Sequence, residues 1–392
     1  MKYLFNFLVF FVFTGTQNSF AQSTSPVNTK TYRVAIFAPL YLDSTFDGSR
    51  LKSENSIPNF AVAGLDFIQG AQIALDTLNL KGQHMDAFIY DSKSASEPVP
   101  LVIKNGKLND VDLIIGSVKE PEYGTLARFA AERKIPFVSA TYPNDGYVRQ
   151  NPFLIIVNST LKAHCEAIFS YLLQKHGTDN IYLVKKKNDN RIDNYFREIN
   201  MAEGKPLLKI KTIMLDSSIS SEGLKYLVDT TKPVVIIGAS LDPTFSQKLS
   251  DAIFPIQKTN PFLFIGMPNW DGFPGFYKKG AYSDFPIRYT SPHYNVKNST
   301  FSNFLQNKYF DLYRTKPSDM AEKGFETTYY FTSILLNHPL DFMHNIDDTS
   351  HAVLHNFNFR PVYHNQSSTM DYYENKHLFI MKILNGETGR EW

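Results

Sequence analysis

The sequence has very little cysteine: Cys165 is the single one in 392 residues. One cysteine excludes an internal disulfide, so we expect the hydrophobic core to stabilise the mature chain. Charge of either sign is not in excess either, because the formal net charge is +2 at pH 7, which gives no indication of binding to nucleic acid or membrane. After the first residues, no apolar run is long enough to span a bilayer.

Motifs of common enzyme classes are also missing. The sequence contains no glycine-rich phosphate loop, no HExxH, no CxxC and no GxSxG. His351, His355 and His364 could form a metal site only if residues 351–355 were helical, and the apolar alternation around them favours a strand. No pair of acids is distinguished by its spacing. We therefore expect a non-enzymatic protein without metal or cofactor.

The N-terminus has the pattern of a secretory signal peptide. Lys2 supplies a positive charge, Leu4–Phe13 is an apolar run, and Ser19-Phe20-Ala21 is a small–x–small cleavage site. No cysteine follows the apolar run, so we do not expect a lipoprotein anchor. Residues 1–21 are therefore predicted to be removed, and the mature protein is predicted to be periplasmic or secreted.

A strand–helix–strand unit dominates the first half of the chain. Asp112–Ile115 is a short apolar strand, Glu120–Arg133 has helical spacing, and Ile135–Ala140 is the next strand. Such a unit gives two parallel neighbours with a right-handed crossover. Ligands bind beyond the carboxyl ends of such strands, which here are the polar stretches Ser117–Lys119 and Ser139–Tyr142.

The alternation of strands and helices occurs twice along the chain. The first run begins at Tyr32–Ala38 and the second at Asn180–Lys185, and they join near Asn158. Two such runs predict two doubly wound α/β domains. The tail differs, because helices over residues 299–336 precede an aromatic, partly alternating stretch, Ala352–Leu384, that reads as strands.

Polar and aromatic residues after strands are candidates for a ligand site. Each has an alternative structural role: the hydroxyls could serve turns, Asp242 could be only a helix cap, and Trp270 could pack within its own domain. Tyr41 could be a lid or simple loop packing. The candidate ligand-binding residues are Tyr41, Ser117, Ser139, Ala140, Thr141, Tyr142, Ser240, Asp242, Trp270, Asp271 and Tyr294.

The order and spacing of several motifs resemble the type I periplasmic binding proteins, in the branch of leucine/isoleucine/valine-binding proteins and receptor ligand-binding regions. The chains most alike are amino-acid transporter binding proteins and related lipoproteins that activate peptidoglycan synthases. The motifs are VAIFAPLY (Val34–Tyr41), FIQGAQIALDTLN (Phe67–Asn79), DLIIGS (Asp112–Ser117), ARFAAERKIPFVSAT (Ala127–Thr141), NPFLIIVNST (Asn151–Thr160) and GFETTYYFTSILL (Gly324–Leu336).

This resemblance implies an α/β fold of two doubly wound parallel-sheet lobes joined by three hinge crossovers. The crossovers are expected near Asn158, near His293–Val296 and near Leu354–Pro361. Lobe 1 would then comprise residues 32–157 and 297–353, and lobe 2 residues 158–296 and 354–392.

The resemblance also implies a function. In amino-acid-binding members, Ser117 and the stretch Ser139–Thr141 would hold a ligand carboxylate, and a second-lobe acid, Asp242 or Asp271, its ammonium group. The sequence departs from the family where Ser117 replaces the usual proline. We expect a small-molecule ligand trapped by hinge closure against Trp270 or Tyr294, and an inner-membrane permease or an envelope enzyme as partner.

The alternative is a cell-envelope interaction protein of the same fold, like the synthase activators, that binds no small molecule. A screen with amino acids, peptides and sugars discriminates the two, because only the first predicts a response.

Overall fold

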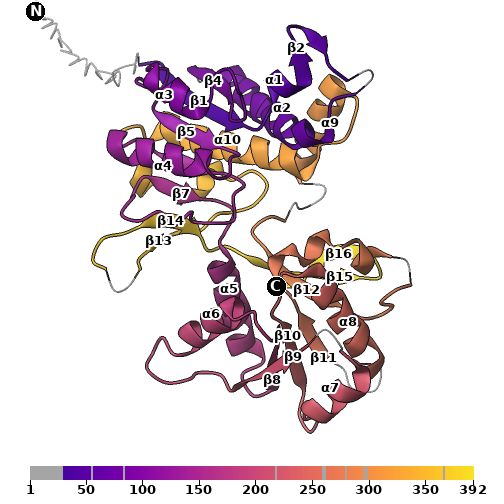
Figure 1. Ribbon diagram of the computed structural model, residues 1–392. Helices are drawn as coiled ribbons and strands as arrows, with labels where there is room; N and C mark the ends of the chain where they lie inside the picture. Colours follow the sequence, from indigo (N-terminus) through magenta and orange to yellow (C-terminus); the bar gives the residue numbers. More distant parts are fainter. Residues whose placement is uncertain are drawn as a thin grey trace, which may run out of the picture. The chain divides into compact units, whose positions relative to one another are not determined.

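The computed structural model describes residues 30–53, 56–82, 84–216, 219–257, 262–278, 280–294, 296, 299–364 and 367–392. The predicted signal peptide lies outside the described residues. From Tyr32 to Trp392 the strands form two seven-stranded sheets and one two-stranded sheet (Figure 1). Among the described helices, none combines the length and the hydropathy needed to cross a bilayer.

The first sheet has the strand order β13-β14-β7-β6-β5-β1-β4. Its pairs are parallel except for β13 and β14, which are antiparallel. The central strands are short and buried on both faces, as expected when helices cover a parallel sheet. The strands are β1 (Tyr32–Ala38), β4 (Met85–Asp91), β5 (Leu113–Gly116), β6 (Phe137–Ser139), β7 (Leu154–Ile156), β13 (Phe359–Val362) and β14 (Tyr372–Asn375).

Helices cover both faces of this sheet. Alternate residues of β1 point to opposite faces, so Val34 belongs to a cluster with residues of α2 and α10, whereas Phe37 joins residues of α3 and α4. We call this sheet and its helices lobe 1. The helices are α2 (Asn59–Leu80), α3 (Val99–Lys104), α4 (Glu122–Arg133), α9 (Thr300–Tyr313) and α10 (Asp319–Asn337), with 3-10 turns η3 (Phe342–His344) and η4 (Thr349–His351).

The loop after β1 contains small elements that the sequence did not predict. They are α1 (Leu42–Thr45) and the two-stranded sheet β2 (Phe46–Asp47) with β3 (Arg50–Leu51). The Asp91 carboxylate at the end of β4 accepts the backbone N–H groups of Leu40, Tyr41 and Leu42, which attaches the start of this loop to the sheet edge.

The second sheet has the order β16-β15-β12-β11-β10-β8-β9, parallel from β12 to β9 and antiparallel where β15 and β16 join. One core cluster joins it to its helices, and we call this assembly lobe 2. Its strands are β8 (Asn180–Lys186), β9 (Ile210–Leu215), β10 (Val234–Gly238), β11 (Phe262–Ile265), β12 (Ile287–Ser291), β15 (Phe379–Leu384) and β16 (Glu387–Arg390). Its helices are α5 (Leu161–Lys175), α6 (Arg191–Asn200), α7 (Ser221–Leu227) and α8 (Pro243–Gln257), with η1 (Pro268–Gly272) and η2 (Pro274–Tyr277).

The chain passes between the two sheets three times: after β7, after β12 and after β14. The prediction of two doubly wound parallel-sheet lobes is confirmed. The third crossover, expected near Leu354–Pro361, is wrong, because it lies between β14 and β15. Residue Tyr373 of β14 pairs in parallel with Ile155 of β7, so β13 and β14 extend the first sheet, where Figure 1 shows them beside β7. The alternating pattern identified these strands but not the sheet they join.

Two glycines let α2 and α10 pack with their backbones in contact. A Cβ atom on Gly324 would lie 2.0 Å from the backbone oxygen of Phe67, and one on Gly70 would lie 1.9 Å from that of Ala321. No real Cβ makes so short a contact, so each position requires glycine. The N-terminus of α10 is fixed as well, because the Ser318 hydroxyl accepts the Ala321 N–H and donates to Asp66 of α2.

Replacing Gly324 by alanine tests this contact. The added methyl meets backbone atoms that cannot rotate away, so the helices must separate, and overpacking of this kind costs about 1–3 kcal/mol. We expect a decrease of that size in the free energy of unfolding, measured by urea denaturation. Gly389→Ala is the matched control, because a Cβ there meets nothing within 4 Å. Equal stability of the two variants would contradict the proposed packing.

Candidate functional site

Charged side chains lie in a stripe along one side of α10, from the exposed Asp319 to the buried Glu326. Glu322 and Lys323 lie three and four residues after Asp319, and Glu326 lies four and three residues after them. At these helical spacings the four side chains share a face. Gly324, which packs against α2, lies between Lys323 and Glu326. The close contact between α2 and α10 at Gly324 therefore also determines the positions of the Lys323 and Glu326 side chains.

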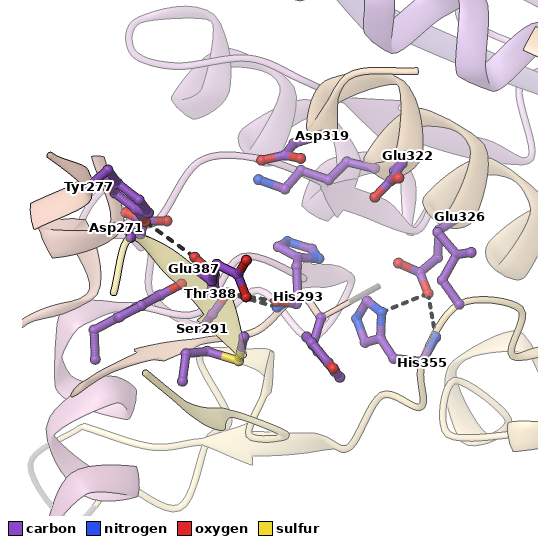
Figure 2. Close-up of a pocket in the computed structure, with 16 residues that line it drawn as sticks. Asp271, Tyr277, Ser291, His293, Asp319, Glu322, Glu326, His355, Glu387 and Thr388 are labelled. Carbon is purple, nitrogen blue, oxygen red and sulfur yellow. Dashed lines mark hydrogen bonds and ion pairs between the residues drawn. The ribbon is translucent and has the colours of Figure 1, made fainter. Parts of the chain in front are cut away.

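This stripe forms one wall of a pocket of about 680 Å³, which we call pocket 1 (Figure 2). Lobe 2 supplies other walls through η1, η2, β12, β15 and β16, and the segments around His293 and His355 complete it. Five carboxylates and one lysine line the pocket. They are Asp271, Asp319, Glu322, Glu326, Glu387 and Lys323.

The electrostatics of pocket 1 therefore favour a ligand that carries positive charge. Partial burial raises the pKa of Asp271, and the nearby Lys323 ammonium opposes this shift. Burial likewise raises the pKa values of Tyr277 and Tyr289, so these phenols stay neutral and can donate hydrogen bonds. Asp271 and Lys323 make no ion pair within 4.0 Å among the described residues.

A pocket of about 330 Å³, which we call the second pocket, shares part of this lining. Asp271, Ser291, His293 and Lys323 line both pockets. The second pocket also reaches Asn158 and Ser159, where the chain first leaves lobe 1. The two pockets are thus adjacent, and an acid from lobe 2 and a lysine from lobe 1 contribute to both.

The predicted lobe 1 residues lie at the carboxyl edge of the sheet, near the second pocket. The hydroxyls of Ser117 and Thr141 are 3.0 Å apart, as parallel neighbours at the ends of β5 and β6 should be. Ser139 and Ala140 are fully buried, and the Ser139 hydroxyl has no partner among the described residues. Asn158, which lines the second pocket, donates to the Thr141 carbonyl at 2.7 Å.

Two predicted tyrosines lie near this edge but contact other aromatic rings. Tyr41 has a left-handed backbone (φ 53°), and its ring meets the edge of Phe60 at 5.0 Å. Tyr142 packs edge-on against Tyr123 at 4.9 Å, and burial raises the pKa of its hydroxyl. Both arrangements are consistent with the packing alternative for these residues.

Ser240 and Asp242 make their hydrogen bonds and ion pair within lobe 2. The buried Ser240 hydroxyl accepts the Asp242 N–H. The Asp242 carboxylate accepts the N–H groups of Thr244 and Phe245 and pairs with Lys186 at 3.0 Å, and these contacts, the lysine first, lower its pKa. Asp242 is therefore a helix cap with a cationic partner.

The prediction that Trp270 forms a wall of the ligand cleft is wrong. Its side chain is fully buried over Gly238 and Gly266, where a Cβ would lie within 2.3 Å of the indole ring. Its N–H donates to the Ser240 carbonyl at 3.0 Å. The neighbouring Asp271 and the partly buried Tyr294 do line pocket 1.

The structure separates the three histidines that the sequence grouped. His351 joins His338 and Asp348 on lobe 1, His364 pairs with Asp371 at 2.7 Å, and His355 joins His293 and Glu326. The first and third groups each place three potential metal-ligating atoms within 4.8 Å of one another. Sequence reasoning missed Glu326, Lys323 and His293, although the polar stripe on the otherwise apolar and aromatic α10 was a detectable signal.

The sequence matches no known protein-family model and no curated protein. Solved structures do match. A protein from Rhodospirillum rubrum assigned to a branched-chain amino acid ABC transporter has a TM-score of 0.66, 12% identity, and coverage of 92% of this chain and 100% of its own. A branched-chain amino acid ABC transporter periplasmic ligand-binding protein from Burkholderia xenovorans has a TM-score of 0.59, 10% identity, and coverages of 92% and 95%.

LpoA from Haemophilus influenzae is also similar, with a TM-score of 0.56 and 12% identity over 93% of this chain and 59% of LpoA. At these identities the likeness concerns the fold. The chain therefore has the fold of the type I periplasmic binding proteins, as the resemblance of its motifs implied.

His164, which lines the second pocket, is a buried histidine held neutral. Its Nδ1 atom lies 2.7 Å from the Thr290 hydroxyl, and burial lowers its pKa to about 3. Because an unfolded histidine has a pKa of about 6.5, the unfolded chain binds this proton between pH 6.5 and 3 while the folded chain does not. This contribution to stability is complete above pH 6.5 and is lost as the pH falls.

We therefore expect His164→Gln to flatten the pH dependence of stability. Between pH 6 and 5 the slope of unfolding free energy should fall by about 1 kcal/mol per pH unit. Urea denaturation at several pH values measures it. Thr290→Val is the control, since it removes the partner but leaves the histidine buried, and it should keep the wild-type slope. A wild-type slope in His164→Gln would contradict this account.

Proposed function

We propose that this protein is a non-enzymatic solute-binding protein that captures a small polar solute bearing an ammonium group and a carboxylate, such as an amino acid. The observation that carries the proposal is the pair Asp271 and Lys323. The two residues have opposite charges, come from different lobes, and line the same two pockets. The fold supports the proposal, because similar structures bear the names of amino acid transport proteins.

Charge complementarity assigns the two ends of the solute. Its ammonium group pairs with Asp271 and the other carboxylates of pocket 1, and its carboxylate pairs with Lys323. Both protein groups are reachable by solvent and lack an ion-pair partner among the described residues, so a bound solute replaces water rather than breaking an existing ion pair. Of the two acids predicted for the ammonium group, Asp271 is preferred because Asp242 already pairs with Lys186.

The Ser117–Thr141 hydroxyl pair is a second anchor for a carboxylate. It stands at the strand ends where ligands of doubly wound sheets bind. Its link to the pockets is Asn158, which donates to the Thr141 carbonyl and lines the second pocket.

Binding is coupled to closure of the lobes. A solute that contacts Asp271 and Lys323 together gains interactions only when the lobes hold both groups around it, so it favours that arrangement. The three crossovers after β7, β12 and β14 serve as the hinge, because a few residues at element ends can absorb such a movement. In this role the protein acts outside the cytoplasm with a permease or a sensor as partner.

Charge-neutralising substitutions test the assignment once a solute is found by thermal shift among amino acids, dipeptides, polyamines and sugars. Hydrogen bonds to charged groups contribute about 1.5–3 kcal/mol, so Asp271→Asn and Lys323→Gln should each weaken binding by roughly tenfold to hundredfold in calorimetry. Exposed Asp311 and Lys316 of the same chain supply matched controls, as Asp311→Asn and Lys316→Gln.

Unchanged affinity in both pocket variants would refute the site. No response to any solute, together with capture of an envelope enzyme, would instead support an interaction protein of the same fold. LpoA is the similar structure that prompts this second outcome.

A further inference from the structure

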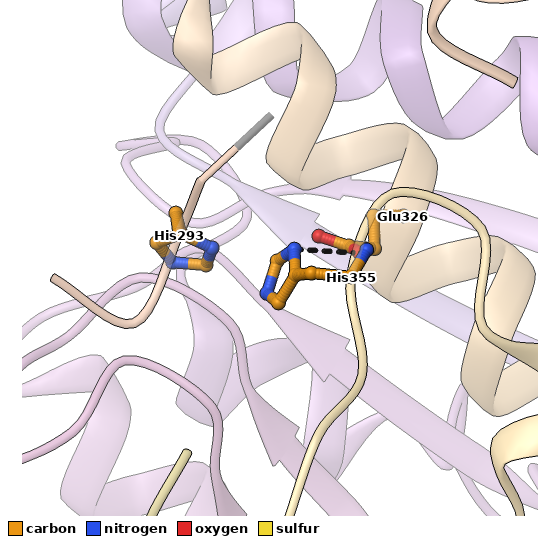
Figure 3. A group of neighbouring side chains, drawn as sticks. All are labelled: His293, Glu326 and His355. Atoms are coloured by element: carbon orange, nitrogen blue, oxygen red, sulfur yellow. Dashed lines mark hydrogen bonds and ion pairs between the residues drawn. The ribbon is translucent and has the colours of Figure 1, made fainter. Parts of the chain in front are cut away.

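Three side chains from distant parts of the chain meet at one side of pocket 1 (Figure 3). His293 follows β12 in the second crossover, Glu326 lies on α10, and His355 lies between η4 and β13. One potential ligand atom of each lies within 4.8 Å of those of the other two.

Two of these side chains are almost completely buried together. The His355 and Glu326 side chains are 5% and 3% exposed, and the Nδ1 atom of His355 lies 3.0 Å from Oε1 of Glu326. The same carboxylate oxygen accepts the backbone N–H of His355 at 3.0 Å. This second bond holds the carboxylate in place beside the ring.

The ring nitrogens of both histidines lack hydrogen bonds. Neither nitrogen of His355 and neither nitrogen of His293 has a hydrogen-bond partner among the described residues, and all four are shielded from solvent. The 3.0 Å approach of His355 to Glu326 does not have the direction of a hydrogen bond. Leaving a buried polar group unpaired costs about 1–3 kcal/mol, so two such rings side by side require an explanation.

Ring packing does not provide it. His293 and His355 meet edge to face at 5.4 Å between centroids, and His355 meets Phe357 at 4.9 Å. Such contacts stabilise the packing of the ring carbons but give the ring nitrogens no hydrogen-bond partner. Two unpaired imidazoles and a fixed carboxylate are instead the donor set of a metal ion with an open position.

We propose that His293, Glu326 and His355 bind a divalent transition-metal ion, with Zn²⁺ as the probe, and that its remaining position faces pocket 1. Around a tetrahedral ion with bonds of about 2.1 Å the ligand atoms are roughly 3.4 Å apart. The three ligand atoms now lie within 4.8 Å of one another, so side-chain movements would have to bring them to this spacing. Two imidazoles select zinc and its neighbours over Mg²⁺ or Ca²⁺, which require oxygen ligands.

A second histidine group of lobe 1 shows the contrast. His338 and His351 lie 3.3 and 3.5 Å from the same Asp348 oxygen, with side chains 35% and 19% exposed. His338 Nε2 hydrogen-bonds to Asp348 and both side chains are partly exposed, so this group lacks the solvent-shielded, unpaired nitrogens of His293 and His355 and needs no metal. It serves as an internal control.

The metal site goes beyond solute binding, since it would join the second crossover to α10. His293 belongs to the segment through which the chain returns from lobe 2, whereas Glu326 and His355 belong to lobe 1. A bound ion therefore fixes one hinge segment on lobe 1, and water or a solute group in pocket 1 completes its coordination.

Zinc titration of the untagged, chelator-treated protein tests the proposal, with no solute present. Calorimetry and metal analysis should show one Zn²⁺ per chain, and Mg²⁺ should not compete. His293→Ala, His355→Ala and Glu326→Gln should each weaken zinc binding at least about tenfold, as loss of a ligand requires. Glu326→Gln keeps the oxygen that accepts the His355 N–H, so it decides the outcome if His355→Ala does not fold.

His176→Ala and His351→Ala are the matched controls. His176 pairs with Asp179 on lobe 2, and both variants should keep wild-type zinc affinity. Absence of zinc binding by the wild type, wild-type affinity in both His293→Ala and Glu326→Gln, or loss of binding in His351→Ala would each overturn the proposal. Because no solute is added, such a failure leaves the solute-binding proposal standing.

Discussion

The close contact of α2 with α10 is the constraint on which the rest depends. Gly70 and Gly324 let the two helix backbones meet, and no other residue fits there without moving a helix. Lys323 and Glu326 are close to Gly324 in sequence, but their side chains lie on the other side of α10 and line pocket 1. A shift of the helix would therefore move the lysine assigned to the solute and the carboxylate assigned to the metal together.

Opposite charges are distributed between the lobes rather than paired within one. Lobe 2 satisfies Asp242 internally with Lys186 and a helix N-terminus, but leaves Asp271 facing the pockets. Lobe 1 likewise leaves Lys323 without an ion pair among the described residues. A bridging solute can pair with Asp271 and Lys323 because neither charge is neutralised within its own lobe. The packing of each lobe is therefore linked to closure.

Local patterns in the sequence predicted the fold well, because apolar strands and amphipathic helices are short-range features. They also brought Ser117 and Thr141 together, since parallel strand ends must lie side by side. They failed for Trp270, whose burial depends on the space above two glycines, Gly238 at the end of β10 and Gly266 directly after β11. The group of His293, Glu326 and His355, like the sheet that β14 joins, depends on long-range pairing that spacing along the chain does not encode.

The central claim is that one solute bridges the lobes and closes them. The most direct measurement is the distance between two spin labels, at Leu80→Cys on α2 and Tyr226→Cys on α7, both highly exposed, while the native Cys165 is buried and stays unlabelled. The account predicts that saturating solute shifts the distance distribution to a single shorter value and that Lys323→Gln reduces this shift. Solute bound at full occupancy with an unchanged distribution would contradict it.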